Sequence, residues 1–220
     1  MNFLIVNDDG ILSKNIFKLK TFLKEYGNVF ICVPDGERSG SSHSTQKNNI
    51  VFENLKKYDK EDNTYYHTGT ASDSVKFFLK FIRTDIDYVI SGVNEGFNLG
   101  IDTVYSGTVG AALEANLYGV KSIALSARKK SDLYWDKLPK VFDLLLKNLD
   151  WGNVKCFNIN FPDFYKEENN MIKFAKVSKN NKNHEVNSDY DLCRKQGYIT
   201  ISPLKFDLTD KESLNKILEK

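Results

Sequence analysis

Two adjacent acidic residues near the N-terminus are the first side chains that could do chemistry. Asp8 and Asp9 stand in the motif Asn7-Asp8-Asp9-Gly10, directly after the apolar residues 2–6. Two buried, ionised carboxylates repel each other, and a divalent cation between them removes that conflict. Oxygen ligands favour Mg²⁺ or Mn²⁺ over Zn²⁺, and Gly10 permits the turn that aims both carboxylates at one point. For the motif alone, a polar turn with a helix N-cap is an equally good interpretation.

A second candidate loop spans residues 34–45 (PDGERSGSSHST) and combines five hydroxyl groups with two glycines, Arg38 and His43. Backbone amides and hydroxyls can surround an anion, and an arginine adds a charge-assisted donor. The same composition is common in flexible Ser/Gly linkers, so that interpretation stays open for this loop by itself.

A third block, residues 92–115, is rich in glycine and carries Asn94 and Asn98. Its glycines let the backbone approach a ligand closely. Ser106-Gly107-Thr108 then begins a predicted helix, whose first amides form a ready phosphate site. Ser106 is also a good N-cap, which is compatible with that role. The block lacks the G-x-G-x-x-G pattern of dinucleotide-binding proteins.

The elements around these loops follow a strand–helix alternation. Continuous apolar runs predict strands at 2–6, 29–33, 87–91, 121–126 and 154–160. Helical spacing predicts helices at 13–26, 72–82, 106–118 and 136–148. This alternation favours an α/β fold with a parallel sheet covered on both faces. Ligands bind at the carboxyl ends of such strands, and each of the three loops follows a strand.

The pattern changes after Pro162. Residues 163–190 are polar and contain one weak strand at 171–177, and 178–189 are the expected flexible loop. A strand at 197–204 and a short helix close the chain. We therefore predict a catalytic core at 1–162 and a C-terminal extension at 163–220 within one domain.

Composition narrows the class of protein. The 220 residues carry a net charge of +2, which is too mild for a nucleic-acid polymer to be an expected partner. Three distant cysteines, Cys32, Cys156 and Cys193, argue against a zinc or disulfide framework and favour the cytoplasm. No apolar run reaches the length of a membrane span, so we expect no membrane association.

Together the three loops resemble the SurE family, stationary-phase survival proteins that act as 5′-nucleotidases. The resemblance covers nearly the whole chain, and its most specific part is SGVNEGFNLGIDTVYSGTV at residues 91–109. The other matching motifs are Asn7-Asp8-Asp9-Gly10, Arg38-Ser39-Gly40 with Ser42 and Ser44, Gly69-Thr70-Ala71-Ser72-Asp73, NINFP at 158–162 and GYITISPLKFDLT at 197–209.

The resemblance implies a Rossmann-like three-layer sandwich with a mostly parallel sheet and a C-terminal β-hairpin and helix used in oligomerisation. It implies one Mg²⁺ or Mn²⁺ ion per subunit, with the ligands Asp8, Asp9, Ser39 and Asn94. The residues it places near the substrate phosphate are Ser39, Gly40, Asn98, Ser106, Gly107 and Thr108. The residues it makes catalytic are Asp8, Asp9, Asn94 and Ser106. It also implies nucleoside 5′- or 3′-monophosphates and short polyphosphate as substrates, and a homodimer or tetramer.

The chain departs from the family pattern at three places. Ala71-Ser72 replaces a usual Pro-Thr, Ile11-Leu12-Ser13 replaces a common Ala-Pro-Gly, and the segment between Pro162 and Ser188 is shorter. The third departure bears on assembly and on base preference.

Several roles remain open from the residues alone. Asp8 is the preferred general base, and His43 is either the acid that protonates the leaving oxygen or a loop histidine with a structural partner. A dinucleotide-dependent oxidoreductase is disfavoured because two aspartates follow the first strand. An aspartyl-nucleophile phosphatase is disfavoured because Asp8 and Asp9 are adjacent. A third alternative is a nucleotide- or metal-sensing module without catalysis, which uses the same residues.

Overall fold

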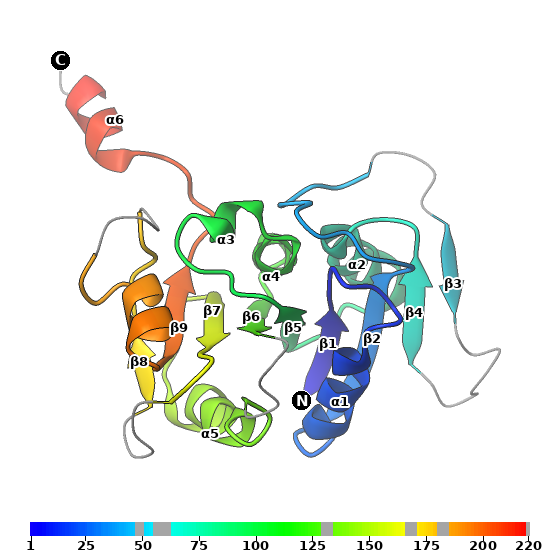
Figure 1. The fold of residues 1–220 in the computed structure, drawn as a ribbon. Coiled ribbons are helices and arrows are strands. Elements are labelled where there is room, and N and C mark those ends of the chain that lie inside the picture. The colour runs from blue at the N-terminus through cyan, green and yellow to red at the C-terminus, as the bar shows by residue number, and fades with distance from the viewer. Residues whose placement is uncertain (47–50, 55–62, 129–133, 166–170, 180–184, 219–220) are drawn as a thin grey trace.

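The structure is a computed structural model that describes residues 1–46, 51–54, 63–128, 134–165, 171–179 and 185–218 (Figure 1). Its strands are β1 (Asn2–Val6), β2 (Asn28–Pro34), β3 (Phe52–Asn54), β4 (Thr64–His67), β5 (Tyr88–Glu95), β6 (Lys121–Ala127), β7 (Cys156–Phe161), β8 (Ile172–Phe174) and β9 (Ile199–Leu204). Its α-helices are α1 (Lys14–Leu23), α2 (Ala71–Phe77), α3 (Asp102–Tyr105), α4 (Gly107–Leu117), α5 (Leu138–Asp143) and α6 (Lys211–Leu218). Three π-helical segments are η2 (Phe78–Ile82), η4 (Leu144–Asn148) and η5 (Asp191–Lys195).

The strands form one nine-stranded sheet in the order β3-β4-β2-β1-β5-β6-β7-β9-β8. The six central strands from β4 to β7 run parallel, whereas β3 and β9 run antiparallel to β4 and β7. The carboxyl ends of β1, β2 and β5 therefore meet at one edge of the sheet, and β1 pairs directly with both of the others. The three predicted loops start from this edge.

Helices cover both faces of the sheet, as Figure 1 shows. Alternate residues of β1 enter different cores. Phe3 and Ile5 pack with residues of α1 and α5, and Leu4 and Val6 pack with residues of α2 and α4. The predicted α/β three-layer fold with a mostly parallel sheet is confirmed.

The C-terminal part differs in detail from the expected hairpin. Its described strands, β8 and β9, pair parallel to each other, and β9 instead returns antiparallel to β7. The helix α6 extends away from the body and buries none of its residues (Figure 1). Because β9 joins the same sheet as the core strands, the division at residue 162 stays a prediction.

The segment at 178–189 was predicted to be a flexible loop, but some of its described residues are buried. Residues 180–184 lie outside the described residues, but Ser178, Ser188 and Asp189 are buried. Within the described ranges, no helix has the length and apolar character needed to cross a membrane.

Candidate metal and phosphate site

The loop after β1 is shaped by Asn7 and Gly10. The buried Asn7 side chain accepts a hydrogen bond from the Gly10 amide and donates one to the Gly10 carbonyl, both at 3.1 Å. Gly10 has φ +86°, and a side chain there would come within 2.8 Å of the Gly36 backbone. Only glycine satisfies both demands, so the turn that presents Asp8 and Asp9 is fixed by its two flanking residues.

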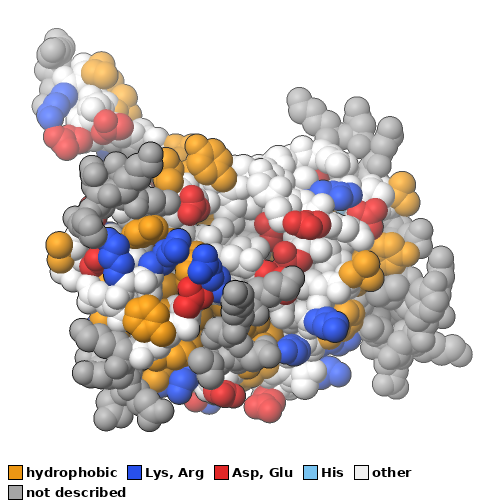
Figure 2. Space-filling view, viewed as in Figure 1, with side chains coloured by type: hydrophobic (Ala, Val, Ile, Leu, Met, Phe, Trp, Pro, Cys, Tyr) orange, Lys and Arg blue, Asp and Glu red, His pale blue; other side chains and the backbone are white. Residues whose placement is uncertain are grey.

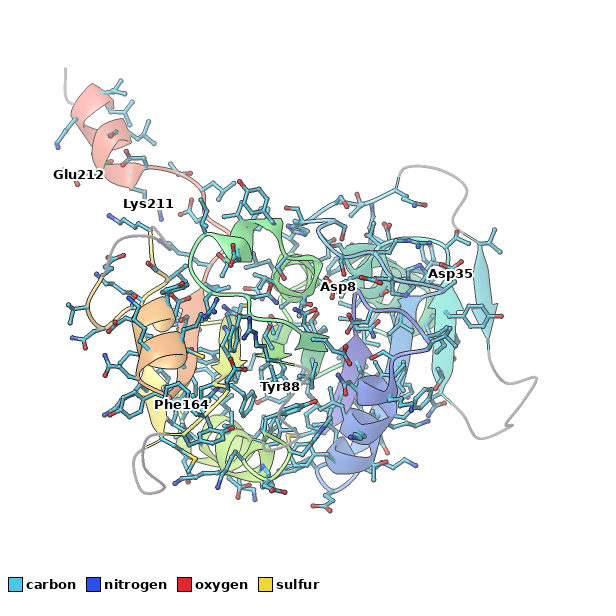
Figure 3. All side chains as sticks on the ribbon, viewed as in Figure 1. Asp8, Asp35, Tyr88, Phe164, Lys211 and Glu212 are labelled. Atoms are coloured by element: carbon cyan, nitrogen blue, oxygen red, sulfur yellow. The ribbon has the colours of Figure 1, made fainter. Side chains whose placement is uncertain are left out.

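Asp8 lies at the end of β1 beside α4 (Figure 3) and is 4% exposed. Its Oδ1 accepts a hydrogen bond of 2.6 Å from the Thr108 hydroxyl. Burial raises the pKa of the Asp8 carboxyl above its usual value, while the hydrogen bonds from Thr108 act in the opposite direction. A cation at this carboxylate would favour its ionised form.

The loop after β2 is hydrogen-bonded to the backbone of Asp8. The Arg38 amide donates to the Asp8 carbonyl at 2.7 Å, and the Ser39 hydroxyl donates to Glu37 at 2.9 Å. The sequence suggested the Arg38 guanidinium as a hydrogen-bond donor to a bound anion, but the guanidinium instead forms an ion pair with Asp35 at 2.8 Å.

Three of the four predicted metal ligands line one cleft. Asp9, Ser39 and Asn94 surround a cavity of about 380 Å³. Its other lining residues are Leu12, Ser13, Glu37 and Glu95. Asn94 donates its amide hydrogen to the Gly96 carbonyl at 3.1 Å, so its side-chain oxygen is the atom suited to a cation. Figure 2 shows acidic side chains gathered near the centre of this view, over the carboxyl end of β1.

The start of α4 comes from the third loop and faces Asp8. Ser106 caps the helix by accepting a hydrogen bond from the Val109 amide at 3.0 Å. A Cβ atom on Gly107 would lie 2.7 Å from Ser41 Oγ and 2.8 Å from Asp8 Oδ2. The absence of a side chain at Gly107 therefore lets the helix terminus approach the Asp8 carboxylate.

Asn98 lies outside the lining of the acidic cleft. Its side-chain amide donates to Ser126 at 2.8 Å, its backbone amide donates to Asn160, and its carbonyl accepts from Asn158 and Asn160. These bonds anchor the third loop over the sheet, and a contact between Asn98 and phosphate stays a prediction.

Two contacts were not apparent from the sequence. His43 Nε2 lies 2.6 Å from Glu114 Oε2 on α4, which gives this histidine a structural partner. Asp189 is fully buried and accepts hydrogen bonds from the amides of Gly100, Ser178 and Tyr190. The small residues Gly107 and Gly110, followed by Glu114 on the same helix face, were the available signal for the first contact.

The donor set fits a divalent cation. Within the described residues, no three His, Cys, Asp or Glu side chains cluster closely enough to hold a metal by themselves. The hydroxyl of Ser39 and the amide oxygen of Asn94 would complete a set begun by Asp8 and Asp9. Such neutral and acidic oxygens suit Mg²⁺ or Mn²⁺. Burial raises the pKa of the Asp8 carboxyl, and a nearby cation would lower that pKa again by stabilising the ionised carboxylate.

Comparison with known proteins decides the family. The family model described as survival protein SurE matches residues 3–184. This chain belongs to the SurE family. The family predicted from the sequence motifs is thereby confirmed.

Several SurE proteins resemble the chain over almost their full length. The "5′-nucleotidase SurE" of Petrotoga mobilis is 34% identical, with 99% of this chain and 98% of the relative covered. The "5′-nucleotidase SurE" of Clostridium botulinum (strain 657 / Type Ba4) is 36% identical, with 96% and 95% covered. The crystal structure of the SurE protein from Aquifex aeolicus superposes with a TM-score of 0.83 at 29% identity and covers both chains fully.

Proposed function

We propose that this SurE-family chain is a 5′-nucleotidase that hydrolyses nucleoside 5′-monophosphates to nucleoside and phosphate. The observation that supports this proposal most directly is that Asp8, in the loop after β1, contacts the first turn of α4. A buried carboxylate beside a helix N-terminus supplies both halves of a metal-assisted phosphate site. Relatives covered almost completely by the alignment bear the name 5′-nucleotidase.

The proposal includes one Mg²⁺ or Mn²⁺ ion per chain, held by Asp8, Asp9, Ser39 and Asn94. A bound divalent cation supplies Lewis acidity to a phosphoryl oxygen and lowers the pKa of a water molecule. The backbone amides at Ser106, Gly107 and Thr108 would stabilise negative charge on the phosphoryl oxygens. The Ser106 hydroxyl, as the helix cap, holds that first turn in place.

Asp8 is our preferred general base. Asp8 Oδ1 already accepts a hydrogen bond from the Thr108 hydroxyl, so Oδ2 is the atom that would take a proton from the attacking water. His43 is bound to Glu114, and we therefore assign it no proton transfer to the leaving group. Activity on nucleoside 3′-monophosphates and on short polyphosphate is a further part of the proposal.

The test is phosphate release by metal-stripped protein with and without added Mn²⁺ or Mg²⁺. The substrates are 5′-AMP, 5′-GMP, 3′-AMP and tripolyphosphate. We expect metal-dependent release from both 5′-nucleotides. Metal-loaded protein that binds 5′-AMP in calorimetry without releasing phosphate would instead make the chain a binding module.

We also propose self-association into a homodimer or tetramer. Leu214, Ile217 and Leu218 of α6 are exposed on a helix that buries none of its residues against the described part of the chain. Large apolar side chains on such an arm are typical of an interaction surface. Light scattering on the full chain tests this, and a monomer at micromolar concentration would exclude it. Residence in the cytoplasm is supported by three buried free cysteines and stays a prediction.

A further inference from the structure

The Ser41 hydroxyl is a buried polar group without a hydrogen-bond partner among the described residues. Its Oγ lies beside the first residue of α4, where the Cβ of any other residue at Gly107 would come within 2.7 Å of it. The same point is 2.8 Å from Asp8 Oδ2. Buried hydroxyls are nearly always hydrogen-bonded because an unsatisfied one is costly. The position of Ser41 therefore calls for a specific explanation.

The neighbouring hydroxyls of the loop are already used within the protein. The Ser39 hydroxyl donates to Glu37, and the Ser42 hydroxyl donates to the Val104 carbonyl at 2.6 Å. Ser41 thus differs from both in having its donor available at the junction of the loop, the helix terminus and Asp8.

The two residues after Ser41 are bonded to the neighbouring helices. The Ser42 amide donates to the Tyr105 carbonyl at 3.0 Å, and His43 is joined to Glu114 at 2.6 Å. A side chain at Gly110 would come within 2.7 Å of the Ser42 carbonyl, so the loop lies directly on α4. A donor fixed in this way costs little reorganisation when it meets a charged ligand.

We propose that Ser41 Oγ donates a hydrogen bond to a non-bridging phosphoryl oxygen of the substrate and of the phosphate product. This inference rests on the proposed function, which places the phosphoryl group between Asp8 and the start of α4. A phosphoryl oxygen there satisfies the buried hydroxyl, and the bond is charge-assisted. Ser41 thereby joins the substrate-contacting residues of the site, among which the family resemblance did not place it.

The experiment compares Ser41→Ala with the wild type and with Ser202→Ala as a matched control. Ser202 lies on β9, is buried, and also carries a hydroxyl without a partner among the described residues. For each full-length protein, calorimetry gives the affinity for inorganic phosphate in the presence of Mn²⁺. Separate titrations give the affinity for Mn²⁺ alone, and a coupled assay gives kcat/KM for 5′-AMP.

We expect Ser41→Ala to weaken phosphate binding and lower kcat/KM, each on the order of tenfold to a hundredfold. Mn²⁺ affinity and thermal stability should stay at the wild-type level, because the hydroxyl makes no hydrogen bond with any of the described residues. Ser202→Ala should leave all four quantities unchanged.

The outcomes separate this inference from the proposed function. If the wild type hydrolyses 5′-AMP and Ser41→Ala binds phosphate equally well, the inference fails and the function stands. If the wild type binds phosphate through Ser41 but hydrolyses no nucleotide, the function fails and the inference stands. A loss of Mn²⁺ affinity in Ser41→Ala, or no phosphate binding by the wild type, would also overturn the role of Ser41.

Discussion

Thr108 Oγ1 donates a hydrogen bond of 2.6 Å to Asp8 Oδ1 and so joins two residues that are 100 positions apart in the chain. Asp8 lies in the loop directly after the first strand, and Thr108 lies in the first turn of the helix that follows the Gly-rich third loop. The bond orients a buried carboxylate and opposes the rise in its pKa that burial causes. It is therefore the structural link between the proposed metal ligands and the proposed phosphate site.

Replacing Thr108 tests this link. We expect Thr108→Val to reduce Mn²⁺ affinity about tenfold, the usual effect of removing a partner that orients a metal ligand. Thr108→Ser keeps the hydroxyl and should retain most of the affinity. Calorimetric titration with Mn²⁺ distinguishes the two variants. Equal affinity in Thr108→Val and the wild type would show that Asp8 needs no such orientation.

Gly107 allows the close approach of α4 to Asp8. We expect Gly107→Ala to lower kcat/KM for 5′-AMP on the order of a hundredfold, because its Cβ displaces Ser41 or Asp8 from the site. Gly36→Ala is the control in the neighbouring loop, since its Cβ would meet only Arg38 Nη1 at 3.7 Å. Steady-state assays with 5′-AMP on both variants provide the check. Full activity in Gly107→Ala would mean that the helix start is not part of the site.

The continuous apolar runs in the sequence located five of the six central strands, all except β4. The apolar runs at 2–6 and 29–33 correspond to β1 and β2, because strands covered on both faces are apolar throughout. The run at 87–91 continues to Glu95 as β5, and the prediction stopped early because the added residues include polar Asn94 and Glu95. The helix predicted at 72–82 is α2 followed by η2, a change of hydrogen bonding that apolar spacing does not reveal.

The site was predictable where it depends on strand ends. Asp9, Ser39 and Asn94 share a cleft because β1, β2 and β5 are neighbours in the sheet. The contact between Asp8 and Thr108 was not predictable, since no local pattern links these two distant residues. Asp189 was hidden for another reason: it stands in an Asn/Lys-rich segment whose composition is typical of a solvated loop.

Asp189 offers a test of how the third loop is held. Its buried carboxylate accepts three backbone amides, including that of Gly100 in this loop. An asparagine has one acceptor oxygen and an amide that cannot accept, so Asp189→Asn should destabilise the fold by about 2–4 kcal/mol and lower kcat/KM. Urea unfolding measures the first effect. Asp136→Asn changes an exposed aspartate and serves as the control; equal stability of the two variants would contradict the anchoring role.

His67 gives the fold a pH dependence. His67 is 1% exposed, its Nδ1 accepts a hydrogen bond from the Gly69 amide, and burial lowers its pKa from 6.5 to about 4. His67 therefore takes up a proton near pH 6.5 in the unfolded chain but only near pH 4 in the folded chain. Stability should fall by about 3 kcal/mol from this group as the pH drops through that window. Urea unfolding between pH 7 and 4 checks the slope, and His67→Gln should flatten it. A slope that persists in His67→Gln must come from other groups.

The most direct test of the central claim combines metal counting with catalysis on one sample. Mn²⁺ bound per chain is measured by electron paramagnetic resonance, and phosphate release from 5′-AMP is measured in parallel, for the wild type, Asp9→Asn and Asp136→Asn. We expect the wild type and Asp136→Asn to bind one Mn²⁺ and to release phosphate only with it. Asp9→Asn should lose both properties while unfolding at the wild-type temperature. Phosphate release by Asp9→Asn at the wild-type rate would contradict a metal-dependent nucleotidase built on Asp8 and Asp9. Phosphate release by the wild type after a chelator has removed its metal would contradict it equally.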